Sequence, residues 1–221
     1  MPLSRRPYLA AALVAILTVL AVLFWAVRPL QEVAEFMSET GPIEEGTAAL
    51  YFLTASAWFL LAARERSSAR ATLAAVAVVL AAFGARELDL HSAWTGASVL
   101  KVSYYLRPAP LHHKLVALAV LVPFALCLLY LLLRHARGVW QGVRQRRPVS
   151  VTVLVFFATI ILSKLVDRSE NVLLEDLGIE FPLWLSVLRA AVEETLEFGL
   201  AVLPWVGWWQ WRKESEPQAG R

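Results

Sequence analysis

YLAAALVAILTVLAVLFWAV, residues 8–27, is a run of twenty residues without a charged side chain. An α-helix of this length is about 30 Å long, which matches the hydrocarbon core of a bilayer. Arg5 and Arg6 precede the run, and it ends in the large residues Phe24 and Trp25 rather than in a small-residue cleavage site. We therefore interpret it as a retained membrane-spanning helix and not as a signal peptide.

Five further apolar runs follow the first. Hydrophobic residues make up 58% of the 221 residues, and the mean hydropathy is +0.58. This is more apolar surface than one soluble core of this size can bury, so the surplus must face lipid. The sequence predicts an all-α, polytopic membrane bundle in one transmembrane domain, residues 1–211, with a tail at 212–221. About six transmembrane helices are expected, at residues 8–28, 42–63, 71–91, 112–133, 149–171 and 183–211.

The orientation follows from the basic residues, which alternate between successive connections. The N-terminus, residues 64–70, residues 134–147 and the tail hold most of the Lys and Arg, whereas nearly all Asp and Glu lie in the other segments. Basic segments stay in the cytoplasm, so both termini are predicted to be cytoplasmic. Four tryptophans between Trp205 and Trp211 mark the inner boundary of the last helix. The composition suggests a Gram-negative inner membrane, with the acidic residues on the periplasmic side.

Two apolar runs, residues 71–85 and 149–163, are too short to cross a bilayer alone. Polar residues must therefore complete both spans within the outer leaflet. In the third helix, Glu87 and His91 are expected on one face because they are four residues apart. The polar residues that extend the third helix are Arg86, Glu87, Asp89 and His91, and those that extend the fifth, on a single predicted face, are Lys164, Asp167, Arg168 and Asn171.

The sixth helix carries charges inside its apolar pattern, namely Arg189, Glu193, Glu194 and Glu197. Counted back from the tryptophans, the three glutamates lie about 8 to 14 Å inside the membrane. Arg189, Glu193 and Glu197 repeat every four residues, so they share a face on which Arg189 can neutralise Glu193. Charges at this depth cost several kcal/mol unless they are paired, hydrated or bound to an ion, which indicates function. The alternative is a salt-bridge network with Arg189, Lys164 and Arg168 that only fixes helix register.

Other polar groups are expected near the same outer end. The first helix is predicted to continue past Arg28, which would align Glu32, Glu35 and Glu39 on one stripe. Residues 92–111 are too polar to span and read as an interfacial or re-entrant segment, either a lid or a long loop. The remaining members of the predicted polar cluster are Glu44 and Glu45 at the start of the second helix and His112 and His113 at the start of the fourth.

The leading functional hypothesis is a metal-dependent membrane enzyme, a hydrolase or transferase acting on a lipid or lipid-linked substrate at the outer leaflet. Carboxylates and histidine would hold a divalent ion, Zn, Mg or Mn, with one position open for water. Glu194 is the expected general base and His91 a ligand or acid, while Lys164 or Arg168 would clamp an anionic group. The candidate metal ligands are Glu193, Glu197, Glu87, Asp89 and Asp167.

Two other classes of function remain open from the sequence. The same carboxylates could serve a proton- or cation-coupled transporter, or the acidic face could meet a partner in a non-catalytic assembly or sensor protein. No Gly-rich phosphate loop is present, so no nucleotide cofactor is expected. The basic residues punctuate apolar runs instead of forming a contact surface, so the expected surroundings are the lipid bilayer and not a nucleic acid.

Overall fold

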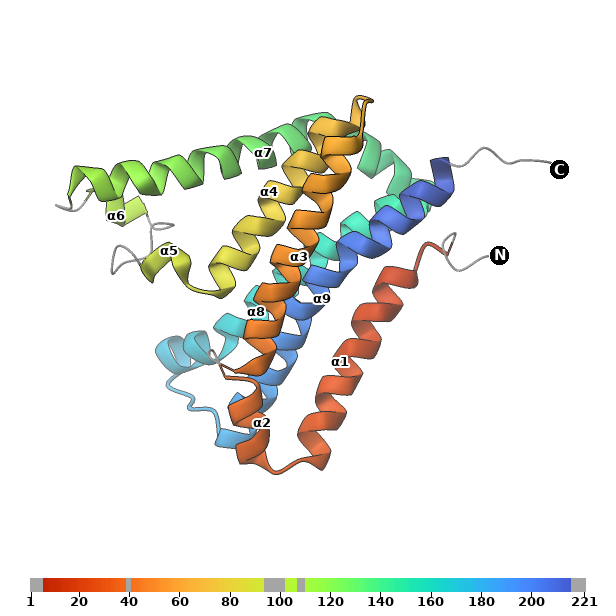
Figure 1. Cartoon of the computed structure of the whole chain (residues 1–221). Coiled ribbons are helices and arrows are strands. Elements are labelled where there is room, and N and C mark those ends of the chain that lie inside the picture. Colours follow the sequence, from red (N-terminus) through yellow and green to blue (C-terminus); the bar gives the residue numbers. More distant parts are fainter. Residues whose placement is uncertain (1–5, 39–40, 94–101, 107–109, 216–221) are drawn as a thin grey trace. The chain divides into compact units, whose positions relative to one another are not determined.

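The computed structural model describes residues 6–38, 41–93, 102–106 and 110–215, and throughout this part of the chain the ordered elements are helices (Figure 1). Those long and apolar enough to cross a membrane are α1 (Leu9–Val27), α3 (Pro42–Arg64), α4 (Ala69–Glu87), α7 (Leu111–Arg144) and α8 (Pro148–Leu177). The predicted fold class, an α-helical membrane bundle, is confirmed. The other helices are α2 (Leu30–Phe36), α5 (Leu90–Ala93), α6 (Val102–Leu106) and α9 (Leu183–Ser215).

The predicted sixth span corresponds to α9, which has 33 residues. It is long enough to cross the bilayer, but its composition is not apolar enough to place it among the candidate membrane-spanning helices. The reason is that charged residues lie on both sides of its apolar part, Arg189 to Glu197 before it and Arg212 to Glu214 after it, which leaves only the 14 residues 198–211 without a charge. The sixth span therefore stays a prediction.

The chain divides into two compact units, and each is described by itself. Unit 1 consists of Met1–Glu44 and Arg137–Arg221, and unit 2 of Glu45–Ala136. Unit 1 contains α1, α2, α8 and α9 together with the last turns of α7. Unit 2 contains most of α3 and α7, together with α4, α5 and α6, which lie between those two helices in the sequence.

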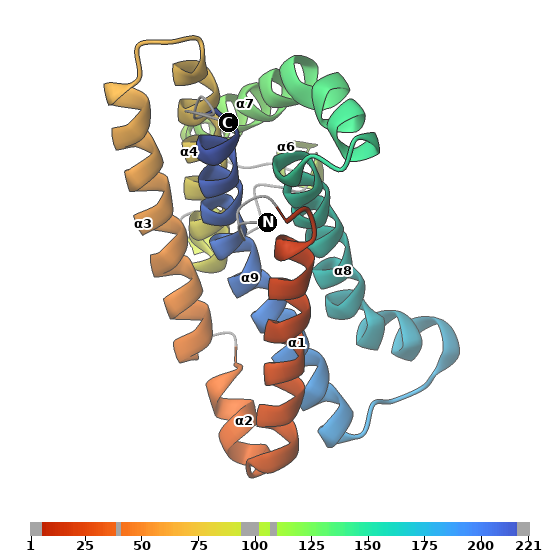
Figure 2. The same cartoon turned by 90° about the vertical axis from the view of Figure 1, so that its right-hand side faces the viewer.

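In unit 1, α9 packs against both α1 and α8 and runs antiparallel to them (Figure 2). The indole N–H of Trp25, near the end of α1, donates to the carbonyl of Trp184 at the start of α9, at 3.1 Å. Near the start of α8, the Thr152 hydroxyl donates to Oε1 of Gln210 in the last part of α9, at 2.6 Å. The start of α1, the start of α8 and the end of α9 consequently lie at one end of unit 1.

The core of unit 1 is built around α9, whose apolar residues Ala191, Leu196, Ala201 and Leu203 are almost completely buried. At the far end, α2 packs on α9 through a cluster of buried residues, namely Val33, Met37, Val187 and Ala191. Burial of this kind holds α9 between its neighbours although it is the most charged of the long helices. The polar side chains of α9 therefore have defined positions within unit 1.

Unit 2 is held by contacts between α3, α4 and α7. Tyr51 of α3 meets the edge of the Phe83 ring of α4, with ring centroids 5.8 Å apart. Gly84 lies so close to α3 that an added Cβ would be 3.1 Å from the Cβ of Tyr51. The Thr72 hydroxyl of α4 lies 2.9 Å from Nε2 of His135 on α7.

The expected continuation of the first helix past Arg28 is wrong. α1 ends at Val27, Arg28 is extended, and α2 begins only after Pro29. The physical reason is the proline ring, which disfavours helical backbone at the preceding residue. Glu32 and Glu35 lie on or beside the separate helix α2, whereas Glu39 is outside the described residues.

The predicted third helix also ends earlier than expected. α4 stops at Glu87, and Asp89 has a positive φ of 49° before the short helix α5. A left-handed residue cannot continue a right-handed helix, so Glu87 and His91 lie on separate helices and their expected alignment on one helix face is wrong. The segment 92–111 is described only in part, through α5 and α6, and its role as a re-entrant or interfacial stretch stays a prediction.

The predicted basic loop at 134–147 is mostly helix, because α7 continues to Arg144 and leaves only residues 145–147 before α8. The tight turn has a backbone hydrogen bond from the Arg147 N–H to the Gly142 carbonyl at 2.8 Å, and Arg146 adopts a left-handed φ of 55°. At its other end α8 runs on to Leu177, where Gly178 adopts a left-handed conformation with φ 65°. The apolar runs do not include the polar ends of these two helices. The helices predicted from those runs, at residues 112–133 and 149–171, are therefore shorter than α7 and α8.

Candidate functional site

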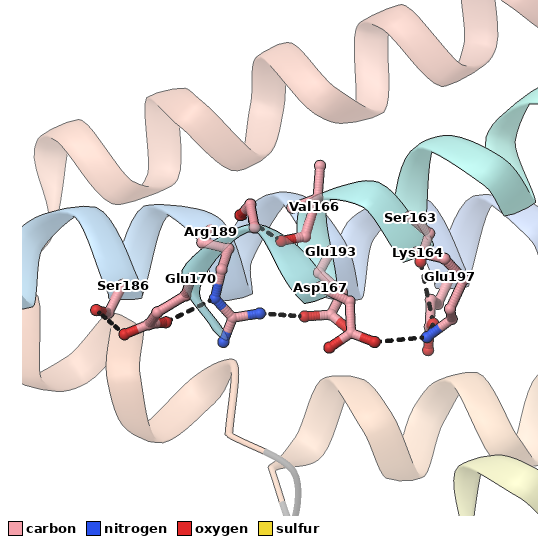
Figure 3. A network of polar contacts seen from close by, with 10 residues as sticks. Ser163, Lys164, Val166, Asp167, Glu170, Ser186, Arg189, Glu193 and Glu197 are labelled. Atoms are coloured by element: carbon pink, nitrogen blue, oxygen red, sulfur yellow. Dashed lines mark hydrogen bonds and ion pairs between the residues drawn. The ribbon is translucent and has the colours of Figure 1, made fainter. Parts of the chain in front are cut away.

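A chain of polar contacts connects α8 and α9 inside unit 1 (Figure 3). We call it the α8–α9 network. Because the two helices are antiparallel, side chains late in α8 meet side chains early in α9. Its members are Ser163, Lys164, Asp167 and Glu170 of α8 and Ser186, Arg189, Glu193 and Glu197 of α9.

Arg189 organises one half of the network. Its Nε donates to Oε2 of Glu170 on α8 at 2.9 Å, and its Nη1 donates to Oε2 of Glu193 on α9 at 2.6 Å. The second oxygen of Glu170 accepts a hydrogen bond from the Ser186 hydroxyl at 2.7 Å. The expected pairing of Arg189 with Glu193 is confirmed. One planar guanidinium thus links two carboxylates from different helices, a geometry that its fixed fork of donors favours.

Lys164 organises the other half. Its Nζ lies 3.2 Å from Oδ2 of Asp167 on its own helix and 3.1 Å from Oε1 of Glu197 on α9. The same oxygen of Glu197 accepts a hydrogen bond from the Ser163 hydroxyl at 3.0 Å. An ammonium group has three donors, so Lys164 can serve both carboxylates at once.

The network is graded in exposure. The side chains of Lys164 and Asp167 are 37% and 38% exposed, whereas those of Glu193 and Glu197 are 14% and 5% exposed. Figure 3 shows Asp167 and Glu193 next to one another, between the Lys164 half and the Arg189 half. The network therefore extends from partly exposed side chains on α8 to buried carboxylates on α9.

The eight members of the network have unequal numbers of positive and negative groups. Lys164 and Arg189 are cationic, while Asp167, Glu170, Glu193 and Glu197 are carboxylates. If all were ionised, the negative groups would exceed the positive ones by two. In a partly buried site between helices, such an excess is costly unless protons or cations compensate it.

The predicted metal ligands do not converge on a common point in the described part of the chain. Within that part, no group of three or more His, Cys, Asp or Glu side chains is placed to hold a metal ion. Glu193 is directed to Arg189, and Asp167 and Glu197 to Lys164. The predicted clamp Lys164 is thus engaged with carboxylates of the protein itself. A metal at this site stays a prediction.

Two predicted residues of the fifth helix lie apart from the network. Arg168 and Asn171 are exposed on α8, so the stripe that meets α9 is displaced by about one residue from the predicted face. Glu194 is buried on α9, one position around the helix from Glu193. Its expected role as general base stays a prediction.

The predicted residues of the third and fourth helices belong to unit 2. Glu87 is buried, with one oxygen 3.2 Å from Nη1 of Arg86. Asp89 and Glu45 are exposed, and the rings of His112 and His113 lie 4.4 Å apart at the start of α7. The side chain of His91 is outside the described part. Glu44, which belongs to unit 1, is half-buried in the first turn of α3. Their membership of a common site stays a prediction.

Three members of the network were not predicted from the sequence, namely Ser163, Glu170 and Ser186. Ser163 is four residues before Asp167, and Glu170 is three residues after Asp167. This spacing places all three on one face of a helix and could have predicted Ser163 and Glu170 from the sequence. Ser186 precedes Arg189 by three residues on α9 in the same way. A predicted helix face that begins at Ser163 contains Asp167 and Glu170. The predicted face began at Lys164 instead, and it therefore contained Arg168 and Asn171.

Comparisons of the chain with protein-family models, with curated proteins and with solved structures give no match. The class of protein, an α-helical membrane protein, therefore rests on the fold, and the functional argument rests on the α8–α9 network.

Proposed function

We propose that this chain is a proton- or cation-coupled membrane transport protein whose coupling site is the α8–α9 network. The observation that carries the proposal is the composition of the network, in which four carboxylates share Lys164 and Arg189. Binding of protons or of a monovalent cation would relieve the excess negative charge. Ionisable groups buried between membrane helices are characteristic of such pathways.

The arrangement of donors supports a site that can exchange partners. Lys164 is shared between Asp167 and Glu197, and Arg189 between Glu170 and Glu193. Neutralising one carboxylate of either pair leaves the cation with the other, so the network can change charge without losing all contact between α8 and α9. This property is required of a coupling site that must load and release an ion in each cycle.

The metal-dependent enzyme predicted from the sequence has less support from the geometry. A catalytic metal needs three protein ligands on one ion together with an open position. In the described part of the chain, the candidate carboxylates of unit 1 are instead distributed over two cationic side chains. Metal analysis of the purified protein separates the two functions, because stoichiometric Zn, Mg or Mn that is lost in E193Q would favour the enzyme.

The proposal is tested by the dependence of thermal stability on cation concentration. A cation that binds the folded protein raises the unfolding temperature as its concentration increases. We expect Na⁺, K⁺ or acidification to raise the unfolding temperature of the wild type at constant ionic strength, and this dependence to disappear in E193Q/E197Q. The matched control is E32Q, since Glu32 lies on α2, is 59% exposed and contacts only Arg28 among the ion pairs of the described residues. Equal dependence in wild type, E193Q/E197Q and E32Q would contradict the proposal.

A further inference from the structure

Two tryptophan–arginine pairs lie at the basic end of unit 1, where α8 starts and α9 ends. In α7, the guanidinium carbon of Arg144 is 5.3 Å from the centre of the Trp140 ring. In α9, that of Arg212 is 5.0 Å from the centre of the Trp208 ring. Each pair is separated by four residues, and we call them the two Trp–Arg pairs. The same local design therefore occurs twice, on different helices.

Both pairs are brought to the same end by contacts of α8. The Arg147 N–H, just before α8, bonds to the Gly142 carbonyl of α7 at 2.8 Å. The first turns of α8 meet the end of α9 through the hydrogen bond from Thr152 to Gln210 at 2.6 Å and the one from the Val149 N–H to Glu214 at 3.5 Å. The ends of α7 and α9 are therefore both anchored on the start of α8.

The charge at this end is strongly positive. Residues 137–150 and 208–215 contain a single acid, Glu214, whereas their basic members are Arg137, Arg144, Arg146, Arg147, Arg212 and Lys213. Arg144 and Arg212 are exposed, and across residues 6–38, 41–93, 102–106 and 110–215 neither forms an ion pair with a carboxylate. Trp140 is itself 58% exposed. Indole rings of this kind are typical of the headgroup layer of a membrane.

An arginine stacked on an indole is well suited to bind a phosphate. The ring covers one face of the guanidinium and limits its orientation, while the N–H groups at its edge remain available for a bidentate contact with phosphate oxygens. At a membrane boundary the phosphate in reach is that of a phospholipid. Basic residues close to a membrane surface favour anionic over zwitterionic lipids.

We propose that the two Trp–Arg pairs form a binding surface for anionic phospholipid, with Arg144 and Arg212 holding the headgroup phosphates. This surface is separate from the α8–α9 network, and the inference does not depend on the proposed function. It predicts that lipid selectivity depends on the stacked arginines more than on the other arginines of the same end.

The test is native mass spectrometry of the full-length protein in detergent, titrated with phosphatidylglycerol or phosphatidylcholine. We expect phosphatidylglycerol to bind preferentially and R144Q/R212Q to weaken its binding about ten-fold more than R146Q/R147Q, the loss expected for one charge-assisted contact. R146Q/R147Q is the matched control, because it removes the same charge at the same end from arginines without a stacked tryptophan.

W140L/W208L provides a second variant that keeps every charge. We expect it to weaken phosphatidylglycerol binding as R144Q/R212Q does, because the arginines lose the rings that orient them. Equal losses in R144Q/R212Q and R146Q/R147Q, or equal binding of the two lipids by the wild type, would overturn the proposal.

Discussion

Arg189 and Lys164 each bridge two carboxylates, and these bridges determine what the buried acids can do. At the residue scale, Arg189–Glu193 was foreseeable because the two residues are four apart on one helix. The contact from Lys164 to Glu197 is one that the predicted alternative, a salt-bridge network between the fifth and sixth helices, includes. The contact from Arg189 to Glu170 was not foreseen, since it joins residues on different helices and Glu170 was not among the predicted residues. Their formation depends on the rotation of α8 about its axis, which hydrophobic periodicity defines only to within about one residue.

The role of Lys164 leads to a prediction about stability. K164Q leaves Asp167 and Glu197 without the cation that they share, so we expect the free energy of unfolding to fall by about 1–3 kcal/mol. In K164Q/E197Q the charge that Lys164 compensated is also removed, and part of the loss should be recovered. Thermal unfolding in detergent measures both changes. A double variant that is destabilised by the full sum of K164Q and E197Q would show that the two residues are not coupled.

At the scale of elements, the apolar runs predicted the long helices well because each needs about twenty apolar residues to cross the bilayer. Their ends were less predictable. Pro29 separated α1 from α2, and Asp89 separated α4 from α5, in stretches where polar periodicity suggested a continuous helix. The basic residues 134–144 were helical although their charge pattern suggested a loop, because charge determines the side of the membrane and not the backbone conformation.

The contact between α7 and α8 leads to a second prediction. A Cβ at Gly142 would lie 2.7 Å from Cβ of Ser150 and would overlap its Oγ, so G142A must displace the start of α8. We expect G142A to lower the free energy of unfolding by about 1–3 kcal/mol. Gly138 is one turn earlier in α7 and has no atom within 4 Å of an added Cβ. G138A should therefore stabilise the helix by about 0.5–1 kcal/mol, and a destabilising G138A together with a neutral G142A would contradict the packing at this turn.

At the scale of the whole molecule, the sequence predicted a helical membrane protein from composition alone, and the structure confirms that class. In unit 1 the predicted separation of charge is also visible, because the basic residues of the α7–α8 turn and the end of α9 share one end, and Glu170, Glu175 and Glu180 lie toward the other. The functional class was not accessible in this way. It depends on whether buried carboxylates meet a metal or cationic side chains, and apolar patterns carry no information about that.

The orientation of α8 gives a prediction for the intact membrane. In a C127S background, which removes the single native cysteine, we expect E180C to react with a membrane-impermeant maleimide from the outside and R146C to react only after permeabilisation. The two positions flank α8, so labelling of both from the same side would show that α8 does not cross the membrane. Labelling of R146C alone from the outside would reverse the predicted orientation.

The most direct test of the account is ion flux through the purified protein in proteoliposomes, recorded under imposed gradients of H⁺, Na⁺ and K⁺. We predict a flux of one of these ions in the wild type and in E32Q, reduced at least about ten-fold in E197Q and in E193Q because each removes a carboxylate of the α8–α9 network. A flux that is equal in all four proteins, or no flux of any of these ions in a folded wild-type protein, would contradict the assignment of the network as an ion-coupling site.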